Sequence, residues 1–309
     1  MNTLLLVDSH AIIHRAYHAL PPLRSQSGIP TNAVYGFFSM LDRAIIDFKP
    51  SHVITCFDTP KPTFRKDLYE DYQANRPSMQ DDLKPQFGTI KELLDCAGIV
   101  RFERPGFEAD DVIGTLATKF KSKDMRVLIL TGDKDILQLV DEHVIVITPQ
   151  TGLSTIKLYN PEEVHKKFDI QPLQIPDYKA LAGDPSDNYH AAKGIGPKTA
   201  VKLIHQFNTI ENLYEHLDEV ENEKVKNILL QSKEKVILFK KIATIVTDVD
   251  IECNEDEVLF KGFAKPMRDR LSELQLYSLL KRFFNEKKPV PPKKESVVTI
   301  DEKLQPRLF

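Results

Sequence analysis

The 309-residue sequence has only three cysteines and no long apolar run. Cys56, Cys96 and Cys253 are odd in number and lack the spacing of metal ligands, a pattern typical of reduced thiols in a cytosolic protein. The first apolar run covers four residues before Asp8, and none approaches the roughly 18 residues that a membrane span needs. These absences predict a cytoplasmic protein with neither a signal peptide nor a membrane helix.

The sequence also has little net charge, −3 from 42 basic and 45 acidic residues. Nine of the acids belong to the site predicted below, so the rest of the chain is net positive. This charge is compatible with a nucleic-acid partner but does not by itself indicate one. The hydrophobic content of 41% is ample for a buried core, and the length suits one large or two modest domains.

Aspartates follow three short apolar runs in the first half of the chain. Residues 4–7 run into Asp8, residues 53–57 run into Asp58, and residues 126–131 are followed by Asp133 and Asp135. Such runs are typical of buried parallel strands. If the three strands are neighbours, their acids share one crevice at the carboxyl edge of the sheet, where open α/β sheets place their sites.

A fourth acidic segment, Glu108-Ala-Asp-Asp111, opens a predicted amphipathic helix, whose first turn favours anions. Any single one of these acids could be an ordinary cap or turn residue. Together they favour a shared pocket, where carboxylates about 4 Å apart repel by about 4 kcal/mol at an effective dielectric of 20 and need a cation. Oxygen ligands without nearby His or Cys suit Mg²⁺ or Mn²⁺ rather than zinc.

A polar, proline-bounded segment follows Asp58 and precedes a predicted helix at residues 84–97. Basic residues alternate there with aromatic ones: Lys61, Arg65, Lys66 and Arg76 with Phe64, Tyr69 and Tyr72. This mixture suits a nucleic-acid single strand, with guanidinium groups on phosphate and rings on bases. The acids of the same segment fit a solvated helical excursion equally well, and both interpretations stay open.

The second half is predicted to be helical from about residue 166 to 286, because strand patterns end near Leu158. Asp184 and Asp187 lie before the run Gly194-Ile-Gly196-Pro-Lys198-Thr199, which is typical of a helix–hairpin–helix. The glycines allow close backbone approach to a phosphate, the next helix points its N–H groups at it, and Lys198 adds charge.

These motifs together resemble the 5′-nuclease domain of bacterial DNA polymerase I and its flap-endonuclease relatives over about residues 1–286. The resemblance rests on Leu-Val-Asp8 with Arg-Ala-Tyr17, Phe-Asp58, Phe-Arg65, Glu108-Ala-Asp-Asp111, Thr-Gly-Asp133-Lys-Asp135, Gly-Asp184-x-Ser-Asp-Asn188 and Gly194-Ile-Gly-Pro-Lys-Thr-Ala200. It implies a parallel-sheet, PIN-like α/β nuclease domain (1–165) with a helical arch at about 61–85, and an all-helical domain containing the helix–hairpin–helix (166–286). The Lys- and Pro-rich composition after Lys287 predicts a flexible tail (287–309).

The resemblance also implies two metal sites, occupied by Mg²⁺ or Mn²⁺. The first would be built by Asp8, Asp58, Glu108, Asp110 and Asp111, and the second by Asp133, Asp135, Asp184 and Asp187. Arg15 would stabilise the reacting phosphate, and DNA would contact Arg65, Tyr72, Arg76, Gly194, Gly196, Lys198 and Thr199, with K⁺ a candidate ligand of the hairpin. The implied activity is two-metal 5′-3′ exonuclease and flap-endonuclease cleavage of DNA, and of RNA primers, by a monomer in replication and repair.

Two departures from the family pattern and two rival functions remain. Gln73 stands where the family usually has a lysine, and Tyr189–Ala192 replaces the usual Ile-Pro-Gly-Val. The rivals are a phosphatase with an aspartyl nucleophile from Asp133-x-Asp135 and a DNA-binding module without catalysis. The sequence does not decide between a stand-alone nuclease and a fragment of a polymerase.

The last five residues, 305–309, resemble a peptide that docks on a replication sliding clamp, through Gln305, Leu308 and Phe309. The basic, proline-rich residues 287–294 would serve as an extended tether. The alternative is a disordered end or a truncated linker with chance similarity.

Overall fold

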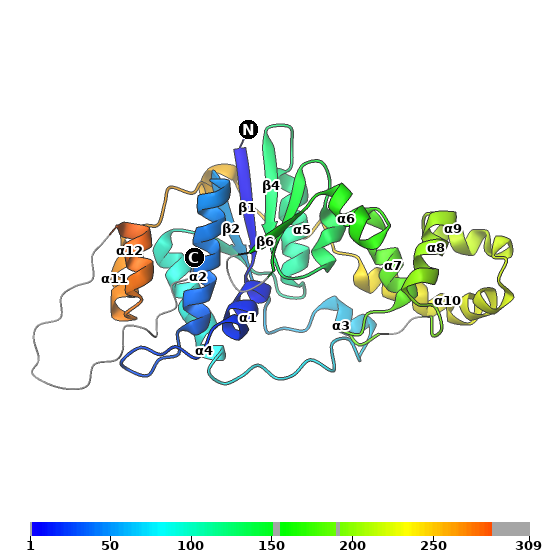
Figure 1. The fold of residues 1–309 in the computed structure, drawn as a ribbon, viewed down its shortest axis with the longest axis horizontal. Helices are drawn as coiled ribbons and strands as arrows, with labels where there is room; N and C mark the ends of the chain where they lie inside the picture. The colour runs from blue at the N-terminus through cyan, green and yellow to red at the C-terminus, as the bar shows by residue number, and fades with distance from the viewer. Residues whose placement is uncertain (1, 151–154, 190–191, 286–309) are drawn as a thin grey trace, which may run out of the picture.

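The centre of the computed structural model is a six-stranded sheet in the order β3-β2-β1-β4-β5-β6 (Figure 1). The structure describes residues 2–150, 155–189 and 192–285. The strands are β1 (Asn2–Asp8), β2 (His52–Cys56), β3 (Val100–Phe102), β4 (Met125–Leu130), β5 (Val144–Pro149) and β6 (Ile156–Tyr159). Neighbours pair in parallel except β5 and β6. The predicted α/β fold with a mostly parallel sheet is confirmed.

Helices cover both faces of this sheet. The helices are α1 (Ser9–Ala19), α2 (Asn32–Phe48), α3 (Phe64–Leu68), α4 (Lys84–Ala97), α5 (Ala109–Phe120), α6 (Pro161–Phe168), α7 (Ile175–Ala182), α8 (Pro197–Phe207), α9 (Ile210–Glu215), α10 (Glu223–Ala243), α11 (Lys265–Glu273) and α12 (Tyr277–Phe284). Short 3₁₀ turns are η1 (Asp135–Leu139), η2 (Pro172–Gln174), η3 (Leu217–Glu219) and η4 (Glu255–Val258).

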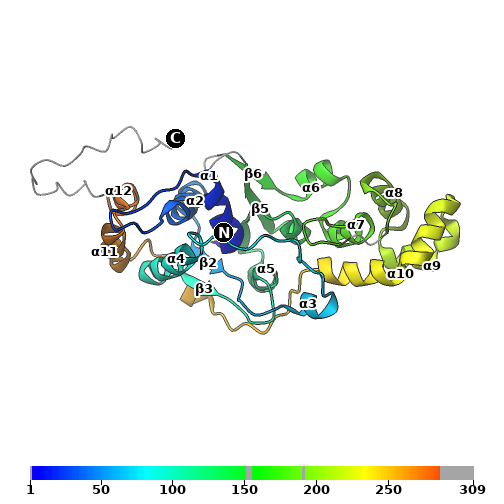
Figure 2. The same cartoon turned by 90° about the horizontal axis from the view of Figure 1, so that it is seen from below.

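The sheet has a separate apolar core on each face, because successive strand residues point in opposite directions. Along β1, Leu4 and Leu6 pack towards α5, whereas Leu5 and Val7 pack towards α1 and α2. Seen from below, α5 and α2 lie on opposite sides of the sheet (Figure 2). A strand buried on both faces reads as a continuous apolar run, which is why these strands were recognisable in the sequence.

β2 and β4 are the two neighbours of β1, which determines where the predicted acids lie. Asp8 ends β1, Asp58 follows β2, and Asp133 follows β4. Because parallel strands end at the same edge, all three aspartates lie at one edge of the sheet.

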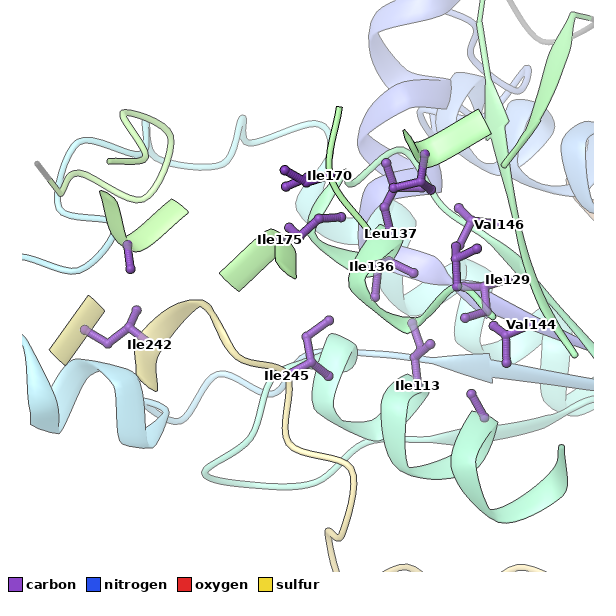
Figure 3. Close-up of a cluster of buried hydrophobic side chains, with 14 of the residues drawn as sticks. Ile113, Ile129, Ile136, Leu137, Val144, Val146, Ile170, Ile175, Ile242 and Ile245 are labelled. Carbon is purple, nitrogen blue, oxygen red and sulfur yellow. The ribbon is translucent and has the colours of Figure 1, made fainter. Parts of the chain in front are cut away.

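The helical part of the chain, with α7 to α10, shares a core with the sheet. Ile242 and Ile245, at the end of α10 and just after it, approach Ile113 of α5 and Leu137 of η1, beside Ile175 of α7 (Figure 3). All five side chains are nearly or fully buried. This shared core holds the helical part in a defined position relative to the edge that carries the acids.

The predicted extent of the helical domain differs from the structure. Residues 166–286 do not form one helical domain, because α11 and α12 pack on α4 and α2, at the opposite end of the molecule from α8–α10 (Figures 1 and 2). Met267 and Leu271 of α11 are fully buried in the core of the first domain. Sequence periodicity identifies a helix but not the surface that covers its apolar face.

The arch at 61–85 is also much less helical than predicted. Only α3 and the start of α4 are helical there, and residues 69–83 form turns and irregular backbone. Prolines at 60, 62, 77 and 85 remove backbone donors, and Gln73 takes a left-handed conformation with φ of 55°. The predicted tail and clamp peptide lie outside the described residues. Within the described ranges, every helix is too short or too polar to cross a membrane.

Gly114 of α5 lies against the segment that follows α10, which contains Ile245 and Val246. A Cβ at Gly114 would come within 2.6 Å of Ile245 Cγ2 and 3.2 Å of the Val246 carbonyl oxygen, whereas a Cβ at Gly88 of α4 would meet nothing within 4 Å. We expect Gly114→Ala to lower the free energy of unfolding by about 1–3 kcal/mol through overpacking. The control, Gly88→Ala, should raise it by about 0.5–1 kcal/mol. Urea denaturation measures both, and equal effects would contradict the packing described here.

Candidate metal centre

Asp8 is buried and held by neutral donors. Its Oδ1 accepts a hydrogen bond from the Ala11 amide at 3.1 Å, which makes it the N-cap of α1, and its Oδ2 accepts one from the Thr131 hydroxyl at 2.5 Å. The Asp133 amide donates in turn to the Thr131 oxygen at 2.9 Å. Thr131, at the end of β4, therefore links the acids that follow two adjacent strands.

Asp58 and Glu108 meet at the start of α5. Asp58 Oδ1 accepts from the Ala109 amide at 2.7 Å, so the acid after β2 contacts the first turn of the neighbouring helix. Glu108 is the N-cap residue of α5, and its side chain accepts from the hydroxyls of Thr63 (3.1 Å) and Tyr72 (3.2 Å). Two hydroxyls of the arch segment thereby orient this carboxylate.

Five of the predicted acids line one open cleft of about 540 Å³. They are Asp8, Asp58, Glu108, Asp110 and Asp133. Basic and aromatic residues complete the cleft wall: His10, His14, Lys61, Lys66, Tyr72 and Arg76. His10 Nδ1 accepts from the Asp58 amide at 3.2 Å, and burial lowers the pKa of this ring, so the neutral imidazole lies against the acids.

The pKa values of the cleft acids show the cost of burying several carboxylates together. Burial raises the pKa of Asp8 to about 7, with Asp58 and Asp133 adding to the rise and the bond from Thr131 opposing it. Burial also raises the pKa of Glu108 to about 7, against the effect of Arg65. The pKa of Asp110 is raised by burial and by its neighbours Asp133 and Asp8. These groups need a cation or protons at neutral pH.

A second group of acids lies where the sheet edge meets the helical part. Oxygens of Asp135, Asp184 and Asp187 lie within 4.8 Å of one another. Lys179 of α7 forms ion pairs with Asp135 and Asp184. Asp187 Oδ1 accepts from Gln73 Nε2 at 3.0 Å and pairs with Arg76 at 3.2 Å.

The pKa values of this second group follow from burial and from Lys179. Burial raises the pKa of Asp135 to about 7, although Lys179 opposes the shift. Burial also acts to raise the pKa of Asp184, but Lys179 and Ser186 outweigh it and the net pKa is lowered. Burial acts to lower the pKa of Lys179, and the two carboxylates more than offset it, so the side chain is an ammonium.

The donor chemistry of both groups fits divalent cations. Every predicted ligand that lies in the cleft or in the second group is a carboxylate, and such oxygen ligands suit Mg²⁺ and Mn²⁺. The three oxygens of the second group are close enough to contact one ion. Burial raises the pKa values of Asp8 and Glu108, and the neighbouring acids add to the rise, so a bound cation would stabilise their ionised forms.

Asp111 does not lie in the cleft, contrary to the prediction. It is fully buried and forms a two-bond ion pair with Arg65, at 2.7 and 2.8 Å. Its oxygens also accept from the amides of Glu108 (3.0 Å) and Val246 (2.9 Å). Because both oxygens are engaged in the core, Asp111 is not positioned as a metal ligand in this structure.

Arg65 and Tyr72 are likewise not placed to contact DNA. Arg65 is 3% exposed, and besides Asp111 it donates to the carbonyl oxygens of Ile242 (2.8 Å) and Thr244 (3.2 Å). Tyr72 is 6% exposed with its hydroxyl on Glu108, so its ring is not free to stack on a base. The sequence shows that these residue types occur in the segment, but not that they turn inward.

The remaining predicted residues have accessible positions. Arg76 is more than half exposed at the cleft wall. Arg15 lines a second hollow with Gly132 and Asp133, and donates to the Gln150 carbonyl. In the hairpin, Gly194 has φ of 109°, Gly196 is the exposed N-cap of α8, Lys198 is exposed and Thr199 is half-buried.

Sequence reasoning missed two residues. Thr131 was within a quoted motif, but its contacts to two acids depend on the adjacency of β1 and β4. Lys179 precedes Asp184 by five residues, and only the fold brings it to Asp135, 44 residues away in sequence. From sequence alone, a lysine on a predicted helix that pairs with buried acids looks the same as one that is exposed to solvent.

Comparison with known proteins gives two family matches. A model described as "5'-3' exonuclease, N-terminal resolvase-like domain" matches residues 3–169, and one described as "5'-3' exonuclease, C-terminal SAM fold" matches residues 170–266. A 5′-3′ exonuclease of Aquifex aeolicus is 40% identical over 282 residues, which cover 91% of this chain and 95% of the relative. DNA polymerase I of Bacillus caldotenax is 40% identical over 259 residues, which cover 84% of this chain but only 30% of that protein.

Solved structures show the same fold. T5 5′-exonuclease with bound zinc ions superposes with a TM-score of 0.65 at 19% identity, covering 92% of this chain and 98% of the other. The catalytic core of Rad2 in complex with a DNA substrate gives 0.57 at 16% identity, covering 92% and 88%. The fold is therefore shared well beyond the range of close sequence similarity.

The buried pair of Asp111 and Arg65 generates a stability prediction. We expect Asp111→Asn to lower the free energy of unfolding by about 3 kcal/mol, because it leaves the Arg65 guanidinium buried without its charge partner. Asp133→Asn is the matched control, since it removes a charge from the crowded cleft and should cause no loss. Chemical denaturation in EDTA compares them; equal losses would contradict the different placement of the two acids.

The raised pKa values predict an unusual pH dependence for the metal-free protein. Asp8, Glu108 and Asp135 have folded pKa values of about 7, so between about pH 4 and 7 the folded state binds more protons than the unfolded chain. Stability in EDTA should therefore fall as pH rises through this window and level off above it. With Mg²⁺ the trend should weaken or reverse, because the ion binds the ionised acids. Thermal denaturation across pH, with and without Mg²⁺, tests this.

Proposed function

Because the chain belongs to the 5′-3′ exonuclease family, we propose that it hydrolyses phosphodiester bonds in DNA that carries a 5′ flap or a 5′ single-stranded end. The supporting observation is one open cleft where five carboxylates from β1, β2, α5 and β4 face basic residues of the arch segment. A second carboxylate group lies next to it, because Asp133 Oδ1 accepts from the Asp135 amide at 2.9 Å.

In this proposal the carboxylates hold divalent ions, which when bound would activate a water molecule and stabilise the charge on the phosphate oxygens. Asp8, Asp58, Glu108 and Asp110 would hold one ion, and Asp135, Asp184 and Asp187 the other. Asp133, which was predicted for the second site, lines the cleft of the first and bonds the Asp135 amide, so it lies between the two groups. The Thr131 hydroxyl orients the Asp8 carboxylate. The hydroxyls of Thr63 and Tyr72 orient the Glu108 carboxylate. Arg76 in the wall of the acidic cleft and Arg15 in the second hollow, which Asp133 also lines, are the candidates to bind the phosphate that is cut.

Duplex DNA would be held at the start of α8. Among the described residues, and apart from its two chain neighbours, no atom lies within 4 Å of a Cβ placed at Gly196, so the backbone there is open to a ligand. Lys198 is exposed beside it. Free N–H groups and the helix dipole favour a phosphate at such a position. Gly194 is needed for a different reason: its φ of 109° is a conformation that residues with a side chain rarely adopt.

Finer parts of the proposal remain predictions. These are Mg²⁺ or Mn²⁺ as the ion, K⁺ at the hairpin, a monomeric state, the cytoplasm as the place of action, and clamp docking by residues 305–309. The chain spans 95% of the Aquifex exonuclease but about a third of the DNA polymerase I relatives, so only the nuclease part of those enzymes bears on it. RNA-primer removal in replication and repair is a further prediction of this proposal.

The proposal is tested by cleavage of a 5′-flap substrate in Mg²⁺, compared with a blunt duplex and a small phosphate ester. We expect cleavage of the flap substrate only, and its loss in EDTA. Asp133→Asn should lower the cleavage rate by at least about 100-fold, the scale of losing a group that stabilises the transition state. DNA binding measured in Ca²⁺ should stay near that of the unchanged protein.

Asp95→Asn is the control, because Asp95 pairs with Arg101 on the exposed surface of α4. Its cleavage rate should equal that of the unchanged protein. Hydrolysis of the phosphate ester would instead support the phosphatase alternative, and DNA binding without cleavage by the unchanged protein would support the binding module.

A further inference from the structure

Lys179 lies at the centre of the second carboxylate group. It belongs to α7, and its ammonium pairs with Asp135 from the sheet edge and with Asp184 from the turn after α7. Only 13% of its side-chain surface is exposed. This is an enclosed charge shared between two elements, unlike a lysine on a solvated helix face.

The two partners of Lys179 are also two of the three acids able to contact one metal ion. The third, Asp187, is bonded to Gln73 and Arg76 of the arch segment. All three acids therefore have a partner within the protein. In the first group, by contrast, Asp8 is held by neutral donors, the Thr131 hydroxyl and the Ala11 amide.

A divalent ion and the Lys179 ammonium compete for the same two carboxylates. The two cations repel each other, and each carboxylate oxygen that the lysine contacts is lost as a ligand. An ion that binds both acids therefore competes with Lys179 and favours its release from at least one of its partners. In the first group neutral donors bond Asp8, and Arg65, at 3.6 Å from Glu108, has Asp111 as its closer partner at 2.7 Å.

We propose that Lys179 is an internal counter-ion of the second carboxylate group, which competes with a divalent cation for Asp135 and Asp184 and thereby sets how tightly that cation binds. The inference rests on the proposed function, because it concerns the same acids. Two consequences follow: the second ion binds more weakly than the first, and Lys179 holds the group together when no ion is bound.

Binding of Mn²⁺ by Lys179→Met tests the competition. Methionine keeps the length of the side chain and removes its charge. Calorimetric titration should show two classes of Mn²⁺ site in the unchanged protein, and the weaker class should tighten by tenfold or more in the variant. The variant should also be less stable than the unchanged protein in EDTA and gain more stability from Mn²⁺.

Two further variants serve as controls. Lys179→Arg keeps the charge and should leave the weaker class unchanged within about threefold. Lys121 pairs with Asp141, and both residues lie just before a strand, at the edge of the sheet opposite to the carboxylate groups. Lys121→Met should therefore change neither class of Mn²⁺ site. An unchanged or weakened second class in Lys179→Met would overturn the inference alone. No Mn²⁺ binding by the unchanged protein would overturn the proposed function as well.

A measurement on the unchanged protein does not depend on the variant being folded. Reductive methylation of lysine amines, read by mass spectrometry, should be slow at Lys179 in EDTA because the amine is enclosed between two acids. Saturating Mn²⁺ should speed it several-fold, whereas Lys121 should react at the same rate in both conditions. A rate at Lys179 that stays the same or falls in Mn²⁺ would contradict the proposed displacement.

Discussion

Repulsion between carboxylates at one edge of the sheet is the constraint on which this structure depends. Parallel strands deliver Asp8, Asp58 and Asp133 to that edge, and α5 adds Glu108 and Asp110. Three features oppose the repulsion: hydrogen bonds from Thr131 and from backbone amides, contacts with arch residues, and raised pKa values that allow protonation. Each is a weaker substitute for the charge of a divalent ion.

The second carboxylate group joins three parts of the chain that are distant in sequence. Asp135 comes from the sheet edge, Asp184 from the turn after α7, and the arch segment reaches Asp187 through Gln73 and Arg76. The apolar core around Ile245 and Leu137 keeps these parts in place (Figure 3). Gln73 stands where the family usually has a lysine. In this chain its side-chain amide donates to Asp187, the acid at the base of the arch segment.

The adjacent acids Asp110 and Asp111 show how one motif can have two tasks. Consecutive helix residues point about 100° apart, so when one faces the cleft the next turns towards the core. Asp110 lines the cleft, whereas Asp111 pairs with Arg65 beneath it. Arg65 in turn bonds the carbonyls at the end of α10, so this ion pair connects the arch and the returning chain to α5.

The sequence by itself determined the buried parallel strands, the start of the helix at Glu108 and, apart from Asp111, the identity of the clustered acids, because these depend on local patterns. Residues 4–7 and 127–130 are apolar since both their faces are covered, and Glu108 begins a helix whose first turn favours acids. Only the tertiary structure decided that Asp111 and Arg65 pair in the core, that Lys179 reaches Asp135, and that α11 and α12 return to the first domain. Those outcomes depend on which surfaces meet across long sequence separations, and a local pattern specifies that a side chain is charged or apolar but not which partner it will find.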